Sequence, residues 1–147
     1  GYASIQAAID AANEGDTILI AEGSYGAFTV NVDNLSIVAV GDVTIQGTFR
    51  TDNNIVGDTK DFFTTATSYS NAAGVGVTIA ADGLTLEGIT INGFYRGVTF
   101  GDGVDSTLIK NVNISDGVTG YYKTEVADVS NLTIEGGTVS QVYLGID

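Results

Sequence analysis

Two tyrosine–cation pairs occur in the second half of the chain, at Tyr95-Arg96 and Tyr122-Lys123. A cation can bind a uronate carboxylate, and a tyrosine ring can stack on a sugar ring. The same groups could abstract a proton beside a carboxylate. The alternative is an ordinary solvated strand face. The pattern predicts substrate binding by Tyr95, Arg96 and Tyr122, with Arg96, Lys123 and Tyr122 as candidates for catalysis.

Acidic turns form a second group of candidates. Asp102 and Asp105 lie in the stretch GDGVD, and Asp58 and Asp61 lie further upstream. Ca²⁺ prefers several oxygen ligands that converge from a loop. Neither stretch matches the EF-hand or the Gly-Gly-x-Gly-x-Asp pattern, so solvated turn aspartates are the alternative. Ca²⁺ is the one cofactor to which these residues point.

An aromatic-rich segment, residues 49–76, is the third candidate. It contains Phe62 and Phe63, and it ends in the loop-like sequence AAGVG. A loop of this kind on the side of a domain often forms a binding wall. The alternative is that both rings fold back and cover the protein. We include Phe62 and Phe63 among the predicted substrate-binding residues.

Composition excludes several kinds of chemistry. The 147 residues include no histidine and no cysteine, which removes Ser-His-Asp and Cys-His catalysis, the usual zinc ligands and disulfides. Eighteen acidic residues against five basic ones give a net charge of −13, so nucleic acid and anionic membranes are unfavourable partners. No apolar run is long enough to predict a membrane span. The acidity favours solubility, with collection of divalent cations as the second interpretation.

The residues that must position these groups form repeats. Three segments align, LTLEGITINGF from Leu84, TLIKNVNISDG from Thr107 and LTIEGGTVSQV from Leu132, with steps of 23 and 25 residues. Each contains two alternating strands that meet at a phase break, and a third strand follows. The third strands predict that Val98, Tyr121 and Ile146 point inward and Thr99, Tyr122 and Asp147 outward. A repeat of this length indicates a solenoid, because one repeat cannot bury its apolar face alone.

Equivalent positions in the repeats predict stacked columns inside the solenoid. Corner asparagines are expected to satisfy backbone groups in a ladder or to serve as ordinary turn residues. One inward column consists of Leu35, Leu84, Thr107 and Leu132, with Thr107 as its weak member, and the next of Ile37, Leu86, Ile109 and Ile134.

The N-terminal stretch predicts a different element. Ile5 and Ile9 are four residues apart, Ser4 stands at a helix N-cap position, and the strand Thr17–Ile20 follows a Gly-Asp turn. This stretch and the repeats resemble the right-handed parallel β-helix superfamily of the pectin-lyase-like kind. The resemblance implies an all-β, right-handed parallel β-helix with about 23 residues per coil, three short strands per coil and a short N-terminal capping α-helix. It divides a single domain into a helix cap (3–14), early coils (17–48), an aromatic-rich insertion (49–76) and regular coils (77–147).

The resemblance covers several functions, including lyases, esterases, epimerases and adhesins. Lyases of this kind hold Ca²⁺ with acidic residues and use an Arg or Lys as base, and alginate-modifying epimerases use an Asp-Pro-His-Glu motif. The sequence lacks that motif, because it has no Pro and no His. We therefore expect a non-catalytic, structural or adhesive module of a secreted or cell-surface bacterial protein that binds polysaccharide or Ca²⁺. The alternative is the N-terminal part of a polysaccharide lyase or uronate epimerase that acts on acidic polysaccharide.

The C-terminal end carries a separate expectation. Residues Val142–Asp147 begin a new coil, the sequence then stops, and no polar cap follows. Solenoids need such caps for solubility. We expect self-association at this end, or further coils in a longer protein of which this chain is a fragment.

Overall fold

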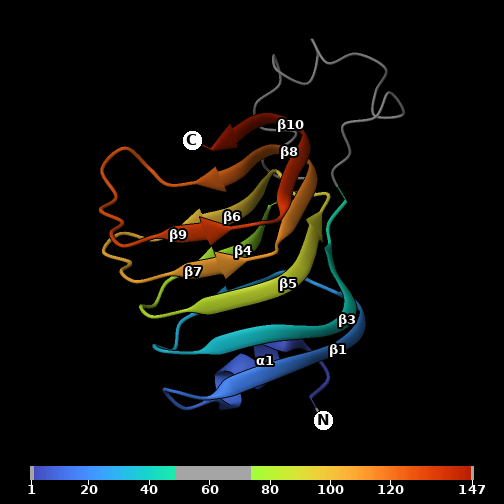
Figure 1. Cartoon of the computed structure of the whole chain (residues 1–147), viewed down its shortest axis with the longest axis vertical. Helices are drawn as coiled ribbons and strands as arrows, with labels where there is room; N and C mark the ends of the chain where they lie inside the picture. Colours follow the sequence, from blue (N-terminus) through green and yellow to red (C-terminus); the bar gives the residue numbers. More distant parts are fainter. Residues whose placement is uncertain (1, 49–73, 147) are drawn as a thin grey trace.

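The protein is a parallel β-solenoid of about four coils with one short N-terminal helix (Figure 1). The computed structural model describes residues 2–48 and 74–146. The predicted fold class is confirmed, because the strands stack in parallel at a repeat of about 23 residues per turn. The elements are α1 (Ile5–Ala11), β1 (Thr17–Tyr25), β2 (Phe28–Val30), β3 (Ser36–Gln46), β4 (Val75–Ile79), β5 (Thr85–Asn92), β6 (Arg96–Phe100), β7 (Leu108–Lys110), β8 (Asn113–Tyr122), β9 (Thr133–Glu135) and β10 (Thr138–Ile146).

Each coil has three sides. In the first three coils a long bent strand, β1, β3 or β5, covers two sides, and a short strand, β2, β4 or β6, covers the third. In the next coil β7 covers the first side and β8 bends around the other two, so that β8 pairs with both β5 and β6. β9 and β10 repeat this arrangement on top.

The inward columns predicted from the repeats are present. Ile37 pairs with Leu86, Leu86 with Ile109, and Ile109 with Ile134. The first three of these side chains are fully buried, whereas Ile134 is 37% exposed because no described coil lies above it. Association at this end stays a prediction.

Helix α1 covers part of the opposite end. The Ser4 hydroxyl accepts the Ala7 N–H at 3.1 Å as the N-cap, and Ile5 and Ile9 are buried against the first coil. The Gln6 side-chain amide bonds both backbone groups of Thr29, accepting its N–H at 2.7 Å and donating to its carbonyl at 3.1 Å. Gln6 therefore replaces the missing neighbour strand of β2, which protects that edge from other strands.

One corner of every coil is left-handed. Asn34, Ser106 and Asn131 have φ between 53° and 62°, and Gly83 occupies the same place in the intervening coil with φ 72°. A Cβ atom at Gly83 would overlap the Asn34 side-chain oxygen, so a larger residue there would have to displace that side chain. The asparagines thus serve as turn residues in a mixed column, because Asn and Gly adopt this conformation most readily.

The predicted insertion, residues 49–76, lies mostly outside the described residues, but its end does not. β4 begins at Val75 and pairs with β6. Gly76 looked loop-like in the sequence, yet a Cβ there would lie 2.8 Å from the Gly97 carbonyl oxygen. The glycine is needed for close packing of two strands rather than for a turn.

Thr107 offers a test of core packing. Thr107 stands in the column with Leu35, Leu84 and Leu132, and it is only 2% exposed. Its hydroxyl has no hydrogen-bond partner among the described residues. An unpartnered buried hydroxyl costs about 1–3 kcal/mol. We expect Thr107→Val to raise the free energy of unfolding by about 1 kcal/mol in chemical denaturation. The control is Thr85→Val on the outer side of β5, with a change of at most about 0.5 kcal/mol. A destabilised Thr107→Val protein would show that the hydroxyl is bonded.

Candidate functional site

The candidate site lies on the outer face of the sheet formed by β2, β4, β6 and the end of β8. Thr29 pairs with Thr78, Thr78 with Thr99, and Thr99 with Tyr122, which places these side chains in one column. The neighbouring column, from Val77 to Tyr121, is buried. Because side chains alternate along a strand, the threonine column and Tyr122 point outward, as predicted. Asp147, the predicted next member, is outside the described residues.

Arg96 lies across this face as a stacked cation. Its guanidinium carbon is 3.6 Å from the centre of the Tyr122 ring and 5.1 Å from the centre of the Tyr95 ring. All three side chains are half-buried. The structure therefore brings together three of the five residues that the sequence predicted to bind substrate, although they come from two adjacent coils. We call Tyr95, Arg96 and Tyr122 the stacked arginine site.

Backbone bonds fix this site between coils. The Tyr95 carbonyl accepts the N–H groups of Val118 and Thr119 at 3.1 and 3.0 Å, and the Arg96 N–H donates to the Gly74 carbonyl at 3.1 Å. The corner that carries the site is thus bonded to the coil on each side. A guanidinium stacked on a ring keeps its in-plane N–H donors available for a carboxylate.

The Lys123 side chain bonds carbonyl groups of its own loop, and its predicted role in catalysis stays a prediction. Its ammonium donates to the carbonyl oxygens of Thr124 and Ala127, both at 3.3 Å. These bonds hold the loop after β8, so the cation is used by the chain's own turn. The stacked arginine site consequently has one positive group rather than two.

Tyr121 belongs to the core. It is 3% exposed, it stacks on Phe100 with ring centres 6.4 Å apart, and burial raises the pKa of its phenol to about 12. A phenol with that pKa stays protonated at neutral pH and is unsuited to act as a base. Behind Tyr122, the Thr99 hydroxyl is enclosed without a hydrogen-bond partner among the described residues.

The acidic turns form a ladder that the sequence analysis missed. The Asp33 carboxylate accepts the Asp82 N–H at 2.9 Å, and the Asp82 carboxylate accepts the Asp105 N–H at 2.9 Å. Asp82 and Asp105 are 23 residues apart, so the repeat spacing itself carried the signal. Each carboxylate satisfies a backbone donor at a corner where the strand ladder is interrupted.

Asp105 ends this ladder with three side-chain bonds. It accepts from the hydroxyls of Ser106 and Ser130 at 3.1 Å each and from the Asn131 amide at 2.7 Å. These bonds, that from Asn131 first, lower the pKa of the Asp105 carboxyl below its ordinary value. Asp102 accepts the Asp128 N–H at 2.8 Å. Both residues serve turns, and the described part of the chain contains no cluster of three acidic side chains fit to hold a metal.

Four predicted site residues fall outside the described residues: Asp58, Asp61, Phe62 and Phe63. Their predicted roles in metal and substrate binding stay predictions. No helix in the described ranges is long and apolar enough to cross a membrane.

Comparison with known proteins gives only a distant structural similarity. No protein-family description matches the sequence, and no curated protein matches it. A solved structure with some similarity is a "putative glycosyl hydrolase" from Parabacteroides merdae ATCC 43184. It is 15% identical, the match covers 92% of this chain and 87% of that chain, and the TM-score is 0.32. A similarity this distant supports no inference about function.

The Asp105 bonds predict how stability depends on pH. Because the pKa of this carboxyl is lower in the folded state, its contribution is present at neutral pH and is lost as pH falls through the folded pKa. We expect Asp105→Asn to lower the thermal midpoint at neutral pH and to reduce its fall on acidification. The control is Asp42→Asn, an exposed residue of β3, with little change. Equal acid sensitivity in the Asp105→Asn and original proteins would contradict the role of these bonds.

Proposed function

We propose that the protein is a non-catalytic β-solenoid module, of the pectin-lyase-like superfamily, that binds acidic polysaccharide through the stacked arginine site. The observation that carries this proposal is the Arg96 guanidinium, 3.6 Å from the Tyr122 ring centre. Stacking presets the orientation of a flexible side chain, which reduces the entropy lost when a ligand binds. A uronate offers the planar carboxylate that a guanidinium binds best.

The net charge of −13 opposes an anionic ligand, but distance limits the repulsion. At physiological ionic strength, charges farther apart than about 8 Å are largely screened from one another. The outer column beside Arg96 is composed of Thr29, Thr78 and Thr99, none of which carries charge. An anionic sugar on this column would therefore meet uncharged threonine side chains beside Arg96.

The chemistry of the site supports binding rather than catalysis. Arginine stays protonated in proteins, and Lys123 is bonded to loop carbonyls. No cluster of three acidic side chains fit to hold a metal lies among the described residues. A secreted or cell-surface location fits this proposal, because acidic polysaccharides are found there.

Binding of an oligogalacturonate, followed by isothermal titration calorimetry, tests the proposal. We expect Arg96→Ala to weaken binding at least tenfold, or about 1.4 kcal/mol, because a charge-assisted bond is lost. Arg96→Lys should restore part of the affinity, since it keeps the charge but not the planar stack. Tyr122→Phe should bind normally and Tyr122→Ala poorly, because the ring is what holds Arg96.

The matched control is Lys110→Ala. Lys110 is an exposed cation on β7, on another side of the solenoid, and its loss changes the net charge by the same amount. If Arg96→Ala and Lys110→Ala weakened binding equally, the effect would come from the net charge of the protein and not from the stacked arginine site. A neutral maltooligosaccharide should not bind. An increase in ultraviolet absorbance that indicates an unsaturated uronate would contradict the non-catalytic proposal, since only eliminative cleavage forms that product.

A further inference from the structure

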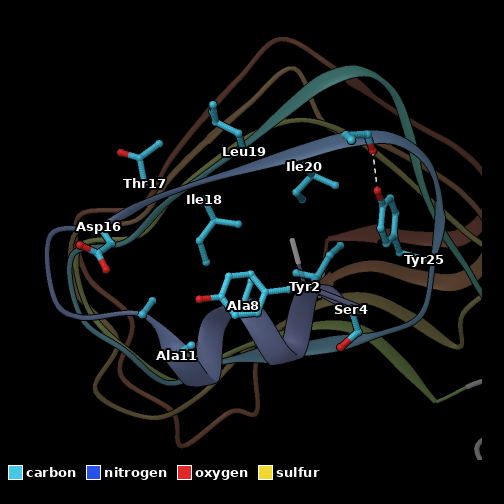
Figure 2. Close-up of a pocket in the computed structure, with 13 residues that line it drawn as sticks. Tyr2, Ser4, Ala8, Ala11, Asp16, Thr17, Ile18, Leu19, Ile20 and Tyr25 are labelled. Atoms are coloured by element: carbon cyan, nitrogen blue, oxygen red, sulfur yellow. Dashed lines mark hydrogen bonds between the residues drawn. The ribbon is translucent and has the colours of Figure 1, made fainter.

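Helix α1 leaves part of the solenoid end uncovered. A pocket of about 510 Å³ lies between α1 and β1. Figure 2 shows Ile18 and Ile20 pointing from β1 toward the helix, while Thr17 and Leu19 point the other way. Ala8 and Ala12 of the helix side also line the pocket. Small alanines opposite two isoleucines leave a trough that is apolar between these side chains, while polar residues such as Asp16 complete the lining of the pocket. Its volume is common for ligand pockets.

The strand beside this trough has a free edge. Among the described strands β1 pairs only with β3. The Ser36 N–H donates to the Asp16 carbonyl, and Thr17 stands opposite Ser36 in the register. Because backbone groups of a parallel strand alternate between its two neighbours, the N–H and C=O of Thr17 and Leu19 face away from β3. β2 has Gln6 to cover its edge, whereas no described strand covers β1.

The N-terminal part of the chain, which forms α1, β1, β2 and β3, carries one sign of charge. Residues 1–48 contain no lysine or arginine, and the first basic residue of the chain is Arg50. The acidic residues in this range are Asp10, Glu14, Asp16, Glu22, Asp33 and Asp42. A purely acidic region favours a basic partner and disfavours a second copy of this chain, whose net charge is −13.

We propose that β1 is a docking edge for an extended basic segment of another protein. The segment adds as a strand beneath β1 and bonds the backbone groups of Thr17 and Leu19. Alternate apolar side chains of the segment enter the trough between Ile18, Ile20 and Ala8. Strand addition of this kind obtains affinity from backbone bonds and specificity from pockets for every second side chain. Leu19, 66% exposed, points outward and contributes its backbone rather than its side chain.

The test uses an acetylated, amidated peptide of alternating lysine and valine, with binding measured by calorimetry. Three other peptides separate the contributions. One has serine in place of valine and tests the trough. Another has glutamate in place of lysine and tests the charge. The third is N-methylated at alternate residues and tests the backbone bonds. We expect each to bind at least tenfold more weakly than the lysine-valine peptide, a loss of about 1.4 kcal/mol.

Two variants of the protein test the edge itself. Leu19→Pro removes an N–H that faces away from β3, so the fold should be retained, as proline is tolerated on strand edges. It should weaken binding of the lysine-valine peptide at least tenfold, whereas Leu19→Ala, which keeps the N–H, should change affinity less than twofold, about 0.4 kcal/mol. If Leu19→Pro does not fold, the N-methylated peptide tests the same bond on the unaltered protein.

Three results would overturn the proposal. One is equal binding of the serine and valine peptides, which would reduce the interaction to charge. Another is amide NMR shift changes confined to the β9 and β10 end. The third is self-association of the protein that Leu19→Pro abolishes, together with no peptide binding, which would assign the edge to a second copy. Shift changes centred on residues 17–21, with the expected order of peptide affinities, would support the proposal.

Discussion

The structure depends on the parallel backbone ladder that stacks one coil on the next. In the inner coils each side bonds to the sides above and below, so each residue position becomes a column that runs along the solenoid. A strand that is shifted by one residue would turn its whole apolar set outward. The fully buried isoleucine and leucine columns therefore fix the register, and the register in turn fixes which side chains meet on the outer faces.

The corners interrupt this ladder, and side chains repair it. At one corner the carboxylates of Asp33 and Asp82 accept backbone N–H groups from the coil above. Stacked carboxylates repel one another, but they are exposed and screened, and each gains a charge-assisted bond. Part of the chain's strong acidity thus has a structural purpose at this corner. A side chain also replaces a strand at the N-terminal end. The Gln6 amide bonds the edge of β2, whereas no described strand pairs with the outer edge of β1.

The two proposed surfaces differ in what they offer a partner. The stacked arginine site presents one oriented cation beside uncharged side chains, which suits a carboxylate on a sugar chain. The edge of β1 presents backbone groups and a partly apolar trough in an acidic N-terminal region, which suit a basic polypeptide. They lie on different sides of the solenoid, because Tyr122 and β1 belong to different faces of different coils. Each can therefore be altered without changing the other.

The sequence by itself determined the fold, the repeat, the helix cap and most of the buried columns. These features are local or periodic: apolar alternation, the spacing between Leu86, Ile109 and Ile134, and a serine before Ile5. It also indicated Tyr95, Arg96 and Tyr122, because residues one coil apart become neighbours in a solenoid. Only the tertiary structure decided that Arg96 stacks on Tyr122 while Lys123 bonds its own loop. Both cations follow a tyrosine in the sequence, and the conformation of their flexible side chains distinguishes them.

The spacing of Asp82 and Asp105 in the sequence indicates that they occupy equivalent places in neighbouring coils, but it does not indicate that their carboxylates bond backbone groups. Asp105 resembles a metal ligand in sequence, and it becomes a turn residue because Ser106, Ser130 and Asn131 surround its carboxylate. Two of those three donors come from the next coil, 25 and 26 residues along the chain. Likewise, the trough between α1 and β1 follows from how far a seven-residue helix reaches across the end of a coil. Composition and period describe each element, but the gap between two elements is set by their packing.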